Sequence, residues 1–152
     1  MDKAAIIERL ERACSVREYC KSDILRRITQ LKGDDNVDGQ EIISHLCSAR
    51  FIDEKRYASA FARDRSALRG WGVRKIRHAL AAKGLSEEDI TCGLEQIDAA
   101  RASQRMEGVL MSRLRSLEAA GGDIFPKLCR FGMGRGYTYR QIKEFYDNNR
   151  TD

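Results

Sequence analysis

The sequence contains a single proline, Pro126, and no segment in which polar and apolar residues alternate at a period of two. Because proline interrupts helices and a period of two is typical of strands, both absences favour a fold built from helices alone. No apolar run reaches the length of about 20 residues that spans a bilayer. Residues 1–14 mix charged and apolar side chains at helical spacing and lack the cleavage site of a secretory signal. We therefore expect a cytoplasmic protein without membrane contact.

The sequence also offers little that could perform catalysis or bind a metal. Its five cysteines are scattered, with no CxxC motif, and its two histidines, His45 and His78, lie far apart. This distribution indicates neither a disulfide framework nor a zinc site. No serine or cysteine lies in a recognisable nucleophile motif, and no phosphate-binding loop follows a strand pattern. We expect no enzyme activity, no catalytic residues, no metal and no cofactor.

The sequence does contain a pattern that occurs three times. Each copy has a helix-capping residue, followed three positions later by an acidic residue or glutamine, as in a capping box. The three caps are Asp38, Ser86 and Thr138. Upstream of each cap stands a glycine, a residue that ends helices because it readily adopts a left-handed backbone conformation. These glycines are Gly33, Gly84 and Gly136. Each copy therefore predicts a helix, a glycine stop, a cap and a second helix.

An amphipathic segment precedes each copy, so the predicted unit has three helices. In the second unit we expect Tyr57, Phe61 and Leu68 to face inward. In the third, residues 131–136 (FGMGRG) carry glycines that cost about 1 kcal/mol each within a helix, and we expect that helix to be short or frayed. The predicted fold is all-α: three tandem three-helix repeats in an elongated array that is able to curve, with boundaries at residues 1–50, 51–98 and 99–152.

Positive charge is concentrated in the second repeat. The segment from Lys55 to Lys83 has nine basic residues and one acidic residue, Asp64, a net charge of +8, whereas the whole chain carries +5. A charge this localised predicts a surface for an anionic partner. Arginine suits such a surface because its planar guanidinium can bind a phosphate or a carboxylate in two places. The charge alone therefore fits both nucleic acid and an acidic protein.

The candidate binding residues combine basic side chains with two aromatic ones, as single-strand-binding proteins do. They are Arg63, Arg65, Arg69, Trp71, Arg74, Lys75, Arg77, Lys83, Lys127, Arg130, Arg135, Tyr139 and Arg140. If they share one edge of the array, they form a continuous basic track. The alternative is that the charges are ordinary solvated helix faces. For Trp71 we favour packing between helices, with one edge of the ring exposed, over stacking on a base.

Four segments that together cover nearly the whole chain carry a resemblance to a known family. They are REYCKSDILRRI (residues 17–28), RFIDEKRYASAFARDR (50–65), RGWGVRKIRHALAAKGL (69–85) and GRGYTYRQIKEF (134–145). In this order they resemble the RecX family, bacterial regulators of the RecA recombinase. The middle two are the most specific, because their combined pattern is hard to obtain from generic helices.

The resemblance implies tandem three-helix repeats and a non-enzymatic negative modulator that lies in the groove of the RecA filament on single-stranded DNA. Such a protein would limit filament growth, and with it ATP hydrolysis, strand exchange and coprotease activity in the SOS response, DNA repair and recombination. We expect a monomer that contacts single-stranded DNA directly or through the filament. Two alternatives remain: a stand-alone nucleic-acid-binding helical module, and a scaffold whose basic edge is incidental.

Overall fold

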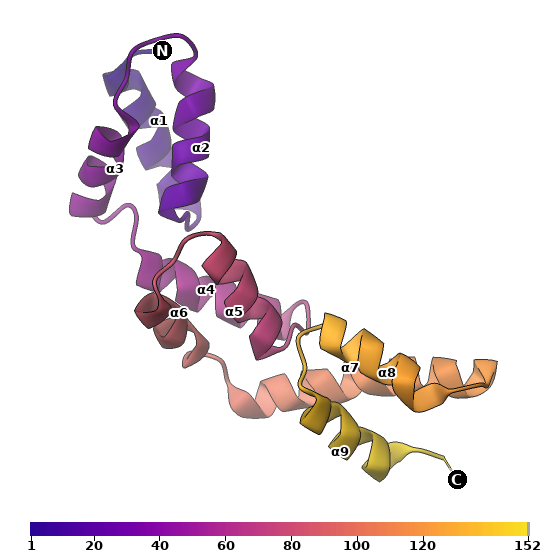
Figure 1. Cartoon of the computed structure of the whole chain (residues 1–152). Helices are drawn as coiled ribbons and strands as arrows, with labels where there is room; N and C mark the ends of the chain where they lie inside the picture. Colours follow the sequence, from indigo (N-terminus) through magenta and orange to yellow (C-terminus); the bar gives the residue numbers. More distant parts are fainter. Residues whose placement is uncertain (152) are drawn as a thin grey trace.

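A computed structural model describes residues 1–151, and within that range the chain forms nine α-helices and no strand. The helices are α1 (Lys3–Val16), α2 (Lys21–Lys32), α3 (Gly39–Ser48), α4 (Glu54–Ala67), α5 (Val73–Ala82), α6 (Glu87–Leu94), α7 (Ala99–Ala120), α8 (Ile124–Gly134) and α9 (Tyr139–Asn149). They follow one another in three groups of three along an elongated molecule, with the two termini at opposite ends (Figure 1). The prediction of an all-α fold of three-helix repeats is confirmed. None of the helices in residues 1–151 is long and apolar enough to cross a membrane.

Each group of helices surrounds a hydrophobic core of its own. The first core is centred on Ile6, Ile24 and Leu46, the second on Phe61, Ile76 and Ile90, and the third on Leu110, Leu128 and Ile142. Two residues pack across the expected limits, because Ile52 belongs to the first core and Cys20 to the second. The division at residues 1–50, 51–98 and 99–152 therefore stays a prediction.

The predicted helix caps and glycine stops are present in all three groups. The Asp38 and Ser86 side chains accept hydrogen bonds from Gln40 N at 3.0 Å and Asp89 N at 3.1 Å. Thr138 and Gln141 form a complete capping box. The three stop glycines all have positive φ: Gly33 (+55°), Gly84 (+86°) and Gly136 (+97°). Local backbone chemistry thus sets the helix boundaries, as the repeat predicted.

Two expectations about helix faces and lengths were wrong. Leu68 does not face inward; it follows the last residue of α4 and is 74% exposed, while Ser66 is buried in its place. The buried side of α4 is rich in small residues because α6 approaches closely there, with Gly93 against Ala58. Helix α8 is not short, since it continues to Gly134 and packs Gly132 against Ile142. Tertiary packing outweighs the low helix propensity of its glycines.

The second and third groups meet through their backbones. Gly72 N, before α5, donates to the carbonyl oxygen of Arg135, after α8, at 2.7 Å, and the Tyr137 hydroxyl donates to the carbonyl of Gly70. A Cβ at Gly72 would overlap the backbone of Gly136. The turn before α5 and the turn after α8 can touch only because neither glycine carries a side chain.

The first and second groups are joined mainly by polar side chains. The Arg56 guanidinium donates to Glu18 at 2.5 Å and to the carbonyl oxygen of Arg50 at 3.1 Å, which ties down the connection between α3 and α4. Lys83 Nζ, after α5, donates to Asp23 Oδ1 of α2 at 2.9 Å. This junction thus combines ion pairs with the burial of Cys20 in the second core, whereas the next one depends on backbone contact.

The alanine variant of Gly72 tests the backbone contact. Gly72 has a φ of −78°, which suits alanine, so the substitution acts only through its overlap with Gly136. We expect Gly72→Ala to lower the free energy of unfolding by about 1–3 kcal/mol, as overpacking does. Urea unfolding followed by circular dichroism measures the change. Gly108→Ala is the matched control, because nothing lies within 4 Å of that position in α7. Equal stability of the two variants would contradict the contact.

The Asp23–Lys83 pair predicts a pH dependence. Partial burial of Asp23 acts to raise its pKa, but hydrogen bonds from Lys83 and Cys20, with the charge of Lys83, outweigh this and hold the pKa below its ordinary value of 3.8. A lowered pKa contributes stability above the ordinary value, which is lost as the pH falls through the lowered one. We expect Asp23→Asn to be less stable than the natural protein at neutral pH by about 1 kcal/mol. The difference should start to shrink as the pH falls below 3.8 and vanish once the pH is below the lowered pKa of Asp23; a constant difference would refute the pair's role.

Candidate partner-binding surface

The centre of the candidate surface is Trp71, in the turn between α4 and α5. Its ring is half-buried against the second core and meets Phe61 edge-on, with 6.2 Å between ring centroids. Two cations lie over the same ring: Lys75 Nζ at 4.5 Å from its centroid and Arg65 Cζ at 5.4 Å. The packing role favoured for Trp71 is present, and the ring also holds two cations by cation–π attraction.

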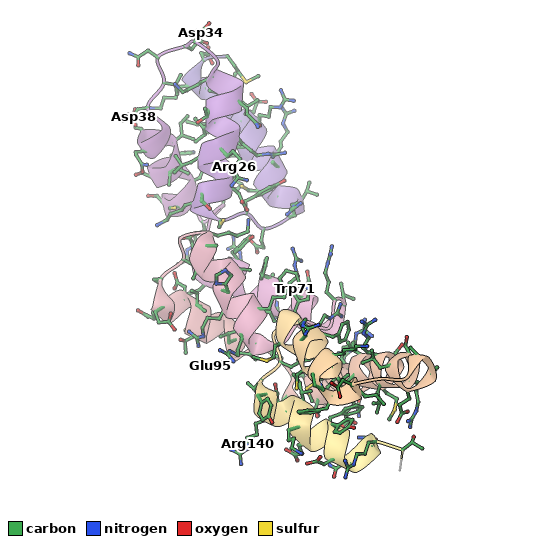
Figure 2. All side chains as sticks on the ribbon, turned by 45° about the vertical axis from the view of Figure 1, so that its right-hand side comes forward. Arg26, Asp34, Asp38, Trp71, Glu95 and Arg140 are labelled. Carbon is green, nitrogen blue, oxygen red and sulfur yellow. The ribbon has the colours of Figure 1, made fainter. Side chains whose placement is uncertain are left out.

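Beside Trp71, a groove of about 490 Å³ runs between the start of α5 and the end of α8. Arg74, Lys75 and His78 line one wall, and Met133 lines the other. Met133 is 49% exposed and adds an apolar contact to a cationic groove. Figure 2 shows Trp71 where the second group meets the third.

The charges around this groove are unneutralised. Within residues 1–151, no carboxylate lies within 4.0 Å of four neighbouring cations, although ten ion pairs form elsewhere. The four are Arg65, Arg69, Arg74 and Lys75. Arg69 adjoins the groove through its backbone, because its carbonyl oxygen accepts a hydrogen bond from Arg135 at 2.6 Å. We call these four residues with Trp71 the Trp71 surface.

Three of the predicted binding residues have internal partners instead. Arg77 of α5 pairs with Glu87 at the start of α6. Lys83 pairs with Asp23 at the first junction, and Arg135 holds the second junction through Arg69. The sequence does not reveal which acidic or carbonyl group the fold brings opposite each of these cations, and a binding role for the three residues stays a prediction.

The remaining predicted residues lie on other surfaces. Arg63 lines a small cavity of about 100 Å³ with Arg101, near the start of α7. Tyr139, 53% exposed, and Arg140 line a cavity of about 430 Å³ on α9. Lys127 and Arg130 are exposed on α8. Figure 2 shows Arg140 well apart from Trp71, and a continuous basic track through all the candidates stays a prediction.

Sequence reasoning missed His78 and Met133 as parts of the groove. An exposed methionine within a helix gives no sequence signal of its own. The one available signal is the glycine on either side of Met133, because two neighbours without side chains leave the methionine prominent on α8. In residues 1–151, no three His, Cys, Asp or Glu side chains are placed to hold a metal ion together.

The fold and this surface together define a helical-repeat protein with a cationic, aromatic-centred face. A family profile described as RecX, second three-helix domain, matches residues 53–94. The chain is 31% identical over 160 residues to the regulatory protein RecX of Clostridium botulinum (strain Alaska E43 / Type E3), covering 96% of this chain and 74% of that protein. The chain belongs to the RecX family.

Other comparisons agree on the family and on the fold. The regulatory protein RecX of C. botulinum (strain Eklund 17B / Type B) is 30% identical over 93% of this chain, which spans 65% of that relative's length. A crystal structure of regulatory protein RecX matches 95% of this chain and 72% of its own, with a TM-score of 0.81 at 20% identity. The crystal structure of RecX from Lactobacillus salivarius matches with a TM-score of 0.74 at 17% identity. At these identities the two structures show the shared fold.

The packing role of Trp71 can be measured. Because the ring is half-buried against the second core, we expect Trp71→Ala to lower the free energy of unfolding by about 2 kcal/mol. Trp71→Phe should lower it much less, because an aromatic ring remains in place. Tyr139→Ala is the control, since that aromatic ring is exposed and should contribute under about 0.5 kcal/mol. Urea unfolding followed by circular dichroism gives all three values. Equal losses at Trp71 and Tyr139 would refute the packing role.

Proposed function

We propose that the protein is a non-enzymatic regulator of the RecA recombinase. It binds the RecA filament on single-stranded DNA through the Trp71 surface and limits filament growth, acting as a cytoplasmic monomer. In this role it lowers the ATP hydrolysis, strand exchange and coprotease activity of the filament, and so restrains recombination, DNA repair and the SOS response. Single-stranded DNA is reached directly or through the filament.

The observation that carries this proposal is the Trp71 surface itself. Two of its four unpaired cations, Arg65 and Lys75, lie over the half-buried Trp71 ring, and Arg74 lines the adjacent groove beside the backbone contact that joins α5 to the third group. Aromatic packing and the glycine contact hold the guanidinium and ammonium groups at set positions, so little conformational entropy is lost when they bind. Arginine fits the carboxylates of a recombinase subunit as well as DNA phosphates. Membership of a family whose proteins are named regulatory proteins supports the same role.

The direct test is RecA ATP hydrolysis on single-stranded DNA. We expect the purified protein to suppress hydrolysis at well below one molecule per RecA subunit, because blocking growth of a filament needs few molecules. Reversal of charge in Arg69→Glu/Arg74→Glu/Lys75→Glu should raise the concentration for half-inhibition at least about tenfold, while helicity is unchanged. Unaffected hydrolysis with the natural protein would refute the function.

A matched control separates the site from overall charge. Lys21→Glu/Lys32→Glu/Arg50→Glu changes the net charge equally in the first group, at side chains for which no carboxylate lies within 4.0 Å in residues 1–151. We expect this variant to inhibit as the natural protein does. If both triple variants lose inhibition equally, the Trp71 surface is not the site.

The second candidate is a nucleic-acid-binding module without a recombinase partner, favoured by the cations on an aromatic ring. The two functions differ in their response to salt. Binding dominated by phosphates loses affinity steeply and log-linearly as salt rises. Binding that includes apolar contacts, such as those of Met133, depends less on salt. Equal salt slopes for the protein on bare DNA and on the RecA filament would favour the second candidate.

A further inference from the structure

The first group of helices appears electrically neutral, with nine basic and nine acidic residues in positions 1–50. Its carboxylates, however, are mostly engaged. Four pair with cations or with the chain's N-terminal ammonium, one lies 4.0 Å from the His45 imidazole, and two cap helices. The four are Glu18, Asp23, Asp35 and Glu41, the neighbour of His45 is Glu11, and the two caps are Asp2 and Asp38. Equal numbers of basic and acidic residues in this group therefore do not mean that its charge is evenly distributed.

Three of the first group's cations without a carboxylate partner line one groove. A groove of about 550 Å³ between α1 and α2 is lined by Arg9, Arg12 and Arg27, and within residues 1–151 no carboxylate lies within 4.0 Å of any of their guanidinium groups. Two acidic residues of this group remain without a cation partner in the part of the chain that the structure describes. Glu8 of α1 is not part of the groove lining and lies within 4.0 Å of none of these guanidinium groups. Asp34 lies with Asp38 at the far tip of the molecule (Figure 2). The groove is therefore a local positive site.

The groove has features beyond charge. Leu10 and Leu31 form part of its lining, and the Gln30 amide adds a donor and an acceptor. The Arg27 guanidinium also lies over the Tyr19 ring at 5.0 Å, and Arg17 lies over the same ring at 4.8 Å. Stacking on an aromatic ring orients the Arg27 guanidinium, as Trp71 does for its neighbours.

We propose that this arginine groove of α1 and α2 is a second binding site, which takes the phosphodiester backbone of a nucleic-acid strand. Three guanidiniums can each bind phosphate oxygens in two places. The apolar part of the lining suits the face of a base, and Gln30 suits a base edge. A ring-stacked guanidinium beside further arginines is the combination that single-strand binders use, so we favour the strand over an acidic protein segment. The inference does not rest on the RecA role, because it concerns the protein and a strand alone.

The test measures the affinity of the full chain for a fluorescent oligothymidylate of roughly 20 nucleotides by anisotropy at several salt concentrations. We expect Arg9→Gln/Arg12→Gln/Arg27→Gln to bind at least about tenfold more weakly and to lower the slope of log affinity against log salt by about 2, since each single-strand phosphate contact contributes about 0.7. A duplex of the same length serves as a second probe. If the groove variant loses less affinity for the duplex than for the single strand, the groove is specific for single strands. If it loses affinity equally for both, the groove binds any phosphodiester backbone.

The matched control is Lys21→Gln/Lys32→Gln/Arg50→Gln, which removes the same charge from the same group outside the groove. We expect a change of under about twofold with this variant. Equal losses in the two triple variants, or none in the groove variant, would overturn the site. Unchanged strand binding with loss of binding to polyglutamate would overturn the strand in favour of an acidic protein. Circular dichroism melting checks that the variants fold. If the groove variant no longer binds the strand but still inhibits RecA, this site acts independently of the Trp71 surface.

Discussion

The backbone contact between Gly72 and Gly136 determines how the second and third groups of helices can be arranged. Two turns lie against each other with no side chain between them, and the hydrogen bond from Gly72 N to the Arg135 carbonyl oxygen aligns them. This sets the separation of α5 and α8, and therefore the width of the groove between Arg74 and Met133. A larger residue at either turn would widen that groove as well as weaken the junction. The candidate surface and the junction are thus parts of one structure.

The cations of this protein fall into two kinds according to what the fold places opposite them. Arg56 and Lys83 meet carboxylates of the preceding group and hold two groups together, and Arg77 meets a carboxylate of the next helix in its own group. Arg65 and Lys75 lie over an aromatic ring, which orients their charge without neutralising it. A ring is a weaker partner than a carboxylate, so the charge stays available to a ligand. The Trp71 surface and the arginine groove both follow this second arrangement.

Much of the fold could be predicted from the sequence because its determinants are local. A cap such as Thr138 and a stop such as Gly136 act within a few residues, so their spacing alone shows where helices begin and end. Which basic side chains are paired and which are free could not be predicted in this way. Whether Lys83 is free depends on Asp23, which lies 60 residues away in sequence. Leu68 was misplaced for a similar reason, because its exposure depends on where α4 ends and how closely α6 packs. The packing role of Trp71 was predictable, since the large ring of a tryptophan in a turn between two helices usually packs against them.

The burial of Cys20 makes the second repeat depend on the first. This side chain precedes α2 of the first group, yet it is fully buried in the second core, beside Tyr57 and Leu80. A fragment confined to residues 53–94, the span of the family profile, would retain its three helices and lose one wall of its interior. The apolar core face that Cys20 covers would instead be exposed to water, at a cost in stability. The middle repeat is therefore complete only when its predecessor is attached, which makes the array a chain of interdependent units.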